Sequence, residues 1–319
     1  MYPGQSWMNP QALWIKGQPI TLGPMRVGQI LDGAFRLYRM RFGTLFVLAS
    51  LVLVPFETLL VIITMGSVEP VTILPGVTVR QPAAWVTYVS LVIRFLFVTP
   101  LLTAALVKTA ADTILGSAST VGSALRGALP RIHSILWVAS LVALAGMVLY
   151  VPGIASVLVG ASASPPDGTL ILLGLIALLA ALVPALTLFV RFSFAPSVVM
   201  VDDIRGIAAL RRSWQLVQGL TKKVLGTTVL AGLLVSVPMF ILGLVSVFVA
   251  FGSLVDASGG PGPAFYGLRE AAEGVIAILT TPFLTLVGVL LYFDARVRKE
   301  RFDLTLMARQ VGRPPPPHR

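Results

Sequence analysis

The sequence predicts an all-α integral membrane protein whose six transmembrane helices form three tandem units, in a pseudo-threefold parallel repeat about an axis along the membrane normal. Three observations predict this fold: an apolar composition, six long apolar stretches, and a motif and a proline that recur from unit to unit. Of the 319 residues, 56% are apolar and 12% are charged, and the mean hydropathy is +0.90. Soluble cores do not accommodate that much apolar surface, so a lipid bilayer is the expected solvent.

The six apolar stretches are each long enough to cross about 30 Å of hydrocarbon at ~1.5 Å per residue. They cover residues 43–65, 83–107, 134–160, 169–200, 224–252 and 272–293. The outer connections, such as GSVEPVTILPGVTVRQP and SLVDASGGPGPAFYG, are rich in turn formers and too short for a separate domain. We therefore expect one membrane domain at 25–311, between a disordered cytoplasmic tail (1–24) and a Pro-rich tail (312–319).

Positive charge is distributed unevenly along the chain. The formal net charge of +11 would suggest nucleic acid as the partner of a soluble protein. However, all but four of the 24 Lys and Arg residues fall on one side of the predicted topology, the exceptions being Arg80, Arg94, Arg191 and Arg269. The positive-inside rule then places both termini in the cytoplasm. The charge thus indicates orientation and contact with anionic lipid headgroups, and not nucleic-acid binding.

Residues 27–42, VGQILDGAFRLYRMRF, have the period of an amphipathic helix. Most of the apolar side chains fall on one side of a helical wheel, and Gln29, Asp32, Arg36 and Arg39 fall on the other. Asp32 and Arg36 have the i,i+4 spacing that supports a helix. We expect this helix to lie along the cytoplasmic interface, where Arg36 and Arg39 contact anionic headgroups.

Two later segments resemble this helix. The octapeptide VGQILDGA at residue 27 recurs as VGSALRGA at residue 121, and GIAALRRSWQLV from residue 206 again precedes an apolar stretch. The third version carries Arg211 and Arg212, a further pair of interfacial basic residues. The predicted repeat units cover about 25–110, 119–203 and 204–295, each consisting of an interfacial helix and a two-helix hairpin.

The spacing of prolines gives an independent sign of repetition. Successive prolines are 97 and 86 residues apart in the odd-numbered spans, and 96 and 86 residues apart in the even-numbered spans. The two series are Pro55, Pro152 and Pro238, and Pro100, Pro196 and Pro282. Each proline removes a helix hydrogen bond, so we expect a bend or a loosened turn near each. Six bends about one axis can enclose a cavity; alternatively, the prolines mark kinks that face lipid.

Glu57 and Arg94 lie well inside apolar stretches, where a charge costs ~2.5–3.5 kcal/mol. Their expected depths differ by about 7 Å, which two long side chains can span. An ion pair that holds the first hairpin together is the leading interpretation. Alternatively, Arg94 lines a cavity and meets an anionic substrate or headgroup, or each side chain extends separately to an interface. For Arg191, extension to the cytoplasmic interface competes with a cavity role shared with Arg94.

The residue types that an enzyme requires are scarce. Cysteine is absent, which excludes disulfides and thiolate sites, and His133 is the one histidine outside the C-terminal tail. Asp202 and Asp203 are followed by no further ligand at metal-binding spacing, and Arg205 can neutralise them. No phosphate-binding loop or G-x-S-x-G motif is present. We expect a protein without enzymatic activity, cofactor or metal.

The segment YFDARVRKERFDLTLMARQ is expected to continue the last helix into the cytoplasm, with an amphipathic extension at 296–311. Asp294 and Arg298 have i,i+4 spacing, and Arg298 and Lys299 belong to a basic cluster at the membrane surface. The apolar side chains that follow can enter the interface or meet a partner helix.

GQILDGAFRLYRMRFGTL and LLYFDARVRKERFDLTLMAR resemble the two ends of a bacterial membrane protein family that is common in actinobacteria. That family is related to the membrane domain fused to some glycerophosphodiester phosphodiesterases. The resemblance covers about residues 24–309 and implies a polytopic inner-membrane protein, with no catalytic residues to carry over. Because the chain has no room for the phosphodiesterase barrel and lacks its His and Glu motifs, we expect no phosphodiesterase activity.

Two functions are expected. The first is a non-enzymatic inner-membrane protein that organises lipids or a membrane protein partner through its basic cytoplasmic helices. The alternative is a transporter of a small anionic or lipid-like solute, which would pass through a proline-kinked helix bundle beside Arg94.

Overall fold

The computed structural model describes residues 12–15, 18–21, 24–74, 77–114, 120–163, 167–255 and 260–300. Six helical spans in it are long and apolar enough to cross a membrane, which confirms the expected number of spans. They are Phe42–Gly66, Ala84–Ile114, Val121–Ser162, Gly168–Asp202, Thr221–Gly252 and Pro263–Glu300. The predicted Pro-rich tail, the C-terminal extension beyond residue 300 and most of the predicted N-terminal tail lie outside the described residues. Within that N-terminal tail, which was expected to be disordered, residues 12–15 and 18–21 form two strands.

The elements follow one another along the chain, with two antiparallel β-hairpins, β1–β2 and β3–β4, among the helices. Their bounds are β1 (Ala12–Ile15), β2 (Gln18–Thr21), α1 (Val27–Met40), α2 (Phe42–Gly66), β3 (Val68–Leu74), β4 (Val77–Pro82), α3 (Ala84–Ile93), the π-helical segment η1 (Arg94–Val98), α4 (Thr99–Ile114), α5 (Val121–Ala128), the 3₁₀ turn η2 (Leu129–Arg131), α6 (Ile132–Ser162), α7 (Gly168–Phe192), α8 (Ala195–Ser197), the π-helical segment η3 (Val198–Asp202), α9 (Ile207–Val217), α10 (Thr221–Val255) and α11 (Pro263–Glu300).

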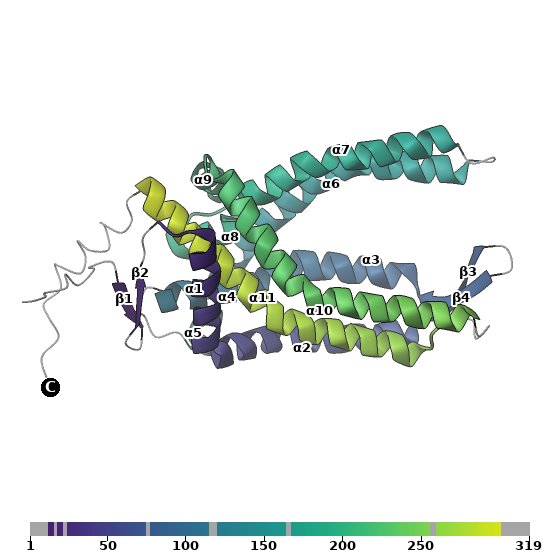
Figure 1. Ribbon diagram of the computed structural model, residues 1–319, viewed down its shortest axis with the longest axis horizontal. Helices are drawn as coiled ribbons and strands as arrows, with labels where there is room; N and C mark the ends of the chain where they lie inside the picture. Colours follow the sequence, from purple (N-terminus) through teal and green to yellow (C-terminus); the bar gives the residue numbers. More distant parts are fainter. Residues whose placement is uncertain are drawn as a thin grey trace, which may run out of the picture.

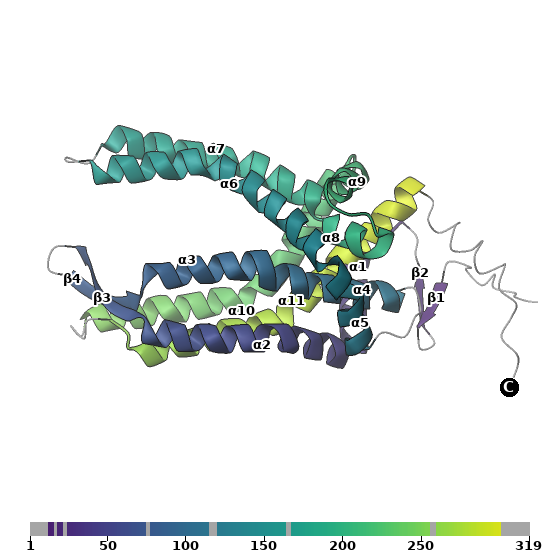
Figure 2. The ribbon, with the colours of Figure 1, turned by 180° about the vertical axis from the view of Figure 1, so that it is seen from behind.

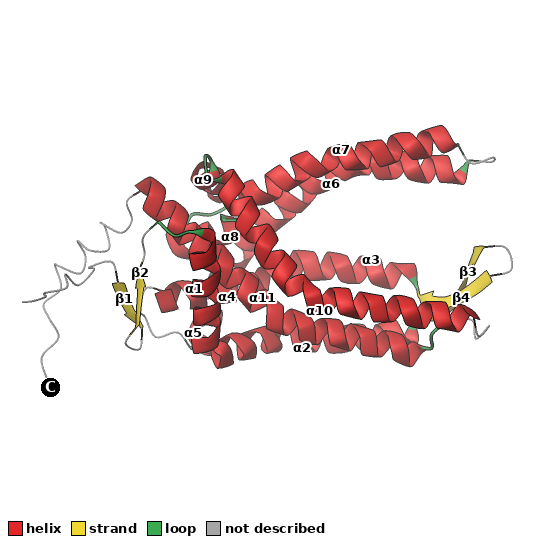
Figure 3. Ribbon diagram, viewed as in Figure 1, coloured by secondary structure: helices red, strands yellow, loops and turns green. Residues whose placement is uncertain are grey.

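The long helices run along one axis and diverge toward one end. α2, α3, α10 and α11 extend together toward the β3–β4 hairpin, whereas the α6–α7 hairpin separates from them in the same direction (Figure 1). The view from behind shows the same divergence (Figure 2). α1 runs across the opposite end of the bundle, and the two small hairpins lie at opposite ends of the molecule (Figure 3). We call these two ends the α1 end and the β3–β4 end.

The main hydrophobic core lies toward the α1 end. Its largest fully buried side chains come from α1, α2, α4, α9 and α11 and from the segment before α8; they include Ile30, Leu45, Leu106, Phe194, Leu216 and Tyr292. Along the spans, by contrast, large apolar side chains point outward, such as Leu179 on α7 and Phe248 on α10. An outward apolar surface of this extent suits a lipid environment.

α1 packs on the protein with one of its sides. Ile30, Ala34 and Leu37 are buried there, α11 and α10 being its main long-helix neighbours, while Phe35 is exposed. The Tyr38 hydroxyl donates to the carbonyl oxygen of Leu279 on α11 at 2.9 Å, and burial raises the pKa of Tyr38. The apolar side of α1, which was expected to face the membrane interface, thus partly packs against α11. It can do so because α11 extends as far as the α1 end.

The α6–α7 hairpin is held together by close backbone approach. A Cβ atom added to Gly174 would lie 2.8 Å from the carbonyl oxygen of Gly153, and one added to Gly160 would lie 2.9 Å from the backbone nitrogen of Ile171. The Ser156 hydroxyl donates to the Leu170 carbonyl oxygen at 2.8 Å. Small residues that let two backbones approach are a common means of helix packing in membranes.

The prolines lie within or beside helices, as their series requires. Pro55, Pro152, Pro238 and Pro282 are inside α2, α6, α10 and α11. The other two adjoin π-helical turns: Pro100 follows η1, in which the Thr99 N–H donates to the carbonyl oxygen of Arg94, and Pro196 precedes η3. α10 also bends along its length (Figure 1). α7 contains a further proline, Pro184, which the two series omit.

Two outer connections differ from the expectation. Val68–Leu74 and Val77–Pro82 pair as the β3–β4 hairpin instead of forming an irregular loop, because their sequences alternate β-branched residues on either side of a Pro-Gly pair. α11 begins at Pro263 instead of residue 272, so Arg269 and Glu270 are helical. This second difference adds charged residues to the β3–β4 end of the bundle.

Candidate functional site

An ion cluster joins three elements in the interior of the bundle. Arg94, the first residue of η1, places Nη2 2.7 Å from Oε2 of Glu57 on α2 and 3.3 Å from Oε1 of Glu270 on α11. The side chain of Glu57 is 7% exposed and that of Arg94 is 27% exposed. The structure therefore brings together the two charges that the sequence singled out and adds a third. π-helical turns are frequent at functional sites, and here one begins at the arginine.

The Glu57 carboxylate fits closely against α11. A Cβ atom added to Gly274 would lie 2.9 Å from Cγ of Glu57, so a glycine is needed where the two helices meet. The Arg94 guanidinium lies 5.7 Å from the ring centre of Phe56, which shields it on one side. Oε1 of Glu57 is buried and has no hydrogen-bond partner among the described residues. One acceptor in the cluster is thus left unused.

A cavity of about 440 Å³ adjoins this cluster at the β3–β4 end. Its charged lining consists of Arg94, Arg269, Glu270 and Glu273, and Tyr266 contributes an aromatic wall. Arg269 Nη2 lies 2.9 Å from Oε1 of Glu273, one turn along α11. The volume is in the range of small-molecule sites. We call this cavity the Arg94 pocket.

A second buried charge, Asp294 of α11, organises the α1 end. Its side chain is 1% exposed, and Oδ1 accepts a hydrogen bond from the backbone N–H of Met25 at 2.7 Å. Lys223 Nζ, from α10, lies 2.5 Å from Oδ2, and Arg298 Nε lies 3.0 Å from the same atom. Lys223 and Arg298 also donate to the Met25 carbonyl oxygen. Asp294 therefore ties the start of α1 to both α10 and α11.

The consecutive carboxylates of Asp202 and Asp203 each form an ion pair with an arginine. Arg296 Nη1 lies 2.9 Å from Asp202 Oδ1, and Arg131 Nε lies 2.8 Å from Asp203 Oδ1. The hydrogen bond and charge of Arg131 lower the pKa of Asp203, with a smaller contribution from Arg205. Within the described residues, no group of three His, Cys, Asp or Glu side chains is placed to hold a metal ion.

The predicted interfacial arginines and lysine divide into two groups. Arg212 pairs with Glu300, Arg298 with Asp294, and Lys299 donates to the carbonyl oxygen of Gln215. By contrast, no described carboxylate lies within ion-pair distance of Arg36, Arg39 or Arg211. No described carboxylate neutralises the charges of the second group, and the charge of Lys299 is likewise not neutralised by its carbonyl partner.

Arg191 lies apart from Arg94. Its guanidinium carbon is 4.1 Å from the ring centre of Trp214 on α9, and its carbonyl oxygen accepts a hydrogen bond from Ser213. It is absent from the lining of the Arg94 pocket. The structure thus places Arg191 at the junction of α7 with α9, away from the Arg94 pocket.

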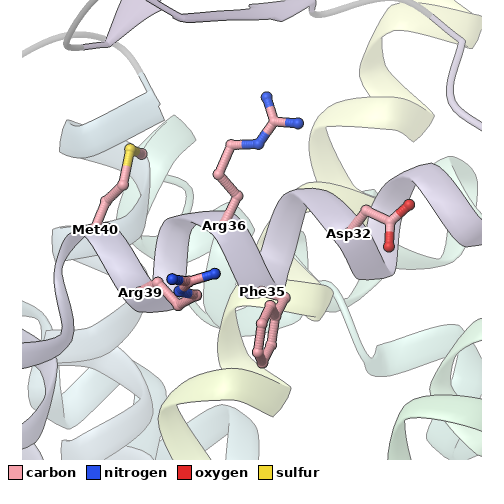
Figure 4. A pocket seen from close by; sticks show the side chains of 5 residues that line it. All are labelled: Asp32, Phe35, Arg36, Arg39 and Met40. Atoms are coloured by element: carbon pink, nitrogen blue, oxygen red, sulfur yellow. The ribbon is translucent and has the colours of Figure 1, made fainter.

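Arg36 and Arg39 line a surface cavity of about 470 Å³ on α1, together with Asp32, Phe35 and Met40. Figure 4 shows that the Arg36 side chain extends away from the axis of α1 and that the Asp32 side chain does not point toward it. The i,i+4 spacing of Asp32 and Arg36 does not produce an ion pair among the described contacts. Both guanidinium groups remain available to an external anion.

Sequence reasoning missed the partners that join distant elements. Glu270 was assigned to an outer loop, although the i,i+4 pair of Arg269 and Glu273 beside it is a helix signal that precedes the assumed start of the last span. Lys223 carried no comparable signal, because its partner Asp294 is 71 residues away in the chain.

These features define a multi-pass α-helical membrane protein with buried ion clusters toward both ends of its bundle. More specifically, the chain belongs to the DUF7847 family, described as a domain of unknown function, whose model matches residues 25–294. No curated protein and no solved structure matches the chain.

Proposed function

We propose that the protein is a non-enzymatic polytopic membrane protein that organises anionic lipids, or a membrane protein partner, through a basic surface at its α1 end. The observation that carries the proposal is that Arg36, Arg39 and Arg211 have no carboxylate partner among the described residues, whereas Arg212, Lys223 and Arg298 do. We call these three residues the free basic surface.

The position of α1 supports headgroup contact. Because α1 crosses the ends of the long helices, it lies parallel to the membrane plane when those helices cross the bilayer (Figure 1). A basic residue at that level gains about 1 kcal/mol from an anionic membrane surface. Phe35, exposed beside Arg36, can enter the same interface.

The finer topology is part of the proposal. The distribution of Lys and Arg supports cytoplasmic termini, and the resemblance of the two ends of the chain to a bacterial family supports a bacterial inner membrane. The three-unit repeat is supported by the positions of α1, α5 and α9, each of which precedes a long helix: α2, α6 and α10. The stretches GQILDGAFRLYRMRFGTL and LLYFDARVRKERFDLTLMAR support a relationship to the membrane domain that is fused to some glycerophosphodiester phosphodiesterases. The proposal does not include phosphodiesterase activity.

Charge reversal of Arg36 and Arg39 together (R36E/R39E) is expected to reduce the retention of phosphatidylglycerol and cardiolipin at least about tenfold, since two attractions become repulsions. Lipids that remain bound to the purified chain after mild detergent extraction are counted by native mass spectrometry. The matched control is Arg80→Glu, at an exposed arginine of the β3–β4 end. Equal retention by the double variant and the wild type contradicts the headgroup proposal.

A transporter of a small anionic or lipid-like solute is the second candidate, favoured by the Arg94 pocket. Single cysteines at Ser90, in the pocket lining, and Leu53, one turn nearer the α1 end than Glu57, test it in this cysteine-free chain. A solute path predicts that a water-borne maleimide reacts with both positions, and Leu179→Cys on the apolar surface stays unlabelled. If only Ser90→Cys is labelled, the pocket does not continue past Glu57 as a water-filled path, and this result contradicts the transporter candidate.

A further inference from the structure

We infer that the Arg94 pocket binds a small organic cation that carries a primary ammonium group. This pocket lies at the β3–β4 end, away from the free basic surface, so the inference is independent of the headgroup proposal. Its ligand would also have the opposite charge to the anionic solute of the transporter alternative.

The charges around the pocket do not balance. Three carboxylates, from Glu57, Glu270 and Glu273, surround two guanidinium groups, and both guanidinium groups are already paired. Arg94 is shared between Glu57 and Glu270, so with all three carboxylates ionised the cluster has one negative charge in excess. An excess charge among apolar helices is costly, and a cation from outside the chain removes that cost.

The acceptors suit an ammonium group. Its N–H donors require several oxygen atoms at different angles, and Glu270 and Glu273 supply carboxylates to the lining, with the side chains of Thr64 and Gln81 beside them. Oε1 of Glu57, which is paired with Arg94 through its other oxygen, is buried and has no described partner. Tyr266 also lines the pocket, and a tyrosine ring can make a cation–π contact with an ammonium group.

A metal ion fits this site less well. A divalent cation requires several carboxylates converging on one point, whereas no described set of three His, Cys, Asp or Glu side chains does so. The cavity volume of about 440 Å³ also exceeds what a bare ion needs and matches a small organic molecule.

Two sources share this chemistry: a free amine, and the headgroup of an aminophospholipid. The pocket reaches Gln81 and Pro82 of β4 at the end of the long helices, where lipid headgroups meet water, and its deeper wall contains Arg94. Either source can therefore bring a primary ammonium group to Glu270.

The test uses the full chain in nanodiscs of phosphatidylglycerol, which has no amine. Ethanolamine is titrated calorimetrically, with uncharged ethylene glycol as the ligand control. In a second arm, native mass spectrometry measures phosphatidylethanolamine retained from a mixture with phosphatidylglycerol. We expect saturable binding in at least one arm, and Glu270→Gln or Glu273→Gln, which keep side-chain volume, should weaken it at least about tenfold.

Glu69→Gln is the matched control, because Glu69 is exposed on β3 at the same end and does not line the pocket. Its binding should equal that of the wild type. Ethanolamine binding identifies a free amine as the ligand source, and selective phosphatidylethanolamine retention alone identifies the lipid. The inference is overturned by no binding in either arm, or by binding that both glutamine variants retain while their thermal unfolding matches the wild type. Loss of anionic lipid in R36E/R39E leaves these outcomes unchanged.

Discussion

Replacing Asp294 by alanine is expected to lower the free energy of unfolding by about 3–5 kcal/mol. The side chain is 1% exposed, and its removal leaves Lys223, 17% exposed, without its carboxylate in the interior. The Met25 N–H also loses its acceptor, so α1 loses one of its attachments to α11. Asp294→Asn keeps an acceptor for Met25 but not the charge, and its effect should therefore be intermediate.

Unfolding of the purified chain in mixed micelles, followed by circular dichroism against increasing dodecyl sulfate, measures this loss. Asp32→Ala is the matched control, since Asp32 lies on the surface of α1 without an ion pair among the described contacts. A change below about 1 kcal/mol for Asp294→Ala, no greater than that of the control, means that Asp294 does not hold the α1 end together.

Replacing Arg94 by methionine is the second large effect, with an expected loss of about 3–5 kcal/mol. The substitution keeps an unbranched side chain but leaves Glu57, 7% exposed, facing Glu270 without a cation between them. Adding Glu57→Gln to it removes one of the two carboxylate charges. The double variant should therefore recover part of the loss, because an uncompensated buried charge costs more than a missing ion pair.

The same dodecyl sulfate titration of wild type, both single variants and the double variant forms a double-mutant cycle. A coupling energy of at least about 1 kcal/mol between positions 57 and 94 is expected for an ion pair at 2.7 Å. Additive effects, with no recovery in R94M/E57Q, would show that the pair contributes little and that the arginine acts through packing on Phe56.

The number of spans could be predicted from the sequence because each depends on local composition. Residues 43–65 and 169–200 were placed within two residues of the helical spans observed. The early start of α11 was missed, because Arg269, Glu270 and Glu273 lower its hydropathy although they keep its helical period. The β3–β4 hairpin carried a recognisable signal, alternating Val, Ile and Thr around a Pro-Gly pair, which composition alone classed as a loop.

The contacts of the candidate site, like the elements of the fold, include some that could be predicted from the sequence and some that could not. Glu57 and Arg94 could be paired in advance, since depth in the bilayer constrains two costly charges on successive spans. The sequence could not indicate that α11, some 170 residues later, would supply Glu270, or that Arg191 would stack on Trp214. Those contacts depend on how helices distant in the chain are arranged, and neither periodicity nor hydropathy carries that information. The three-unit arrangement and the function stay predictions.

The α6–α7 hairpin has a consequence for the order of assembly during synthesis. Its tight glycine contacts join neighbours in the chain, so the hairpin can close as soon as both helices have entered the bilayer. α2, in contrast, packs largely against α11, the last of the described helices to be made. Of the described residues, Arg94 is the ion-pair partner of Glu57, and it is synthesised well before α11. The Glu57–Arg94 ion pair can thus stabilise α2 in the membrane before α11 is synthesised.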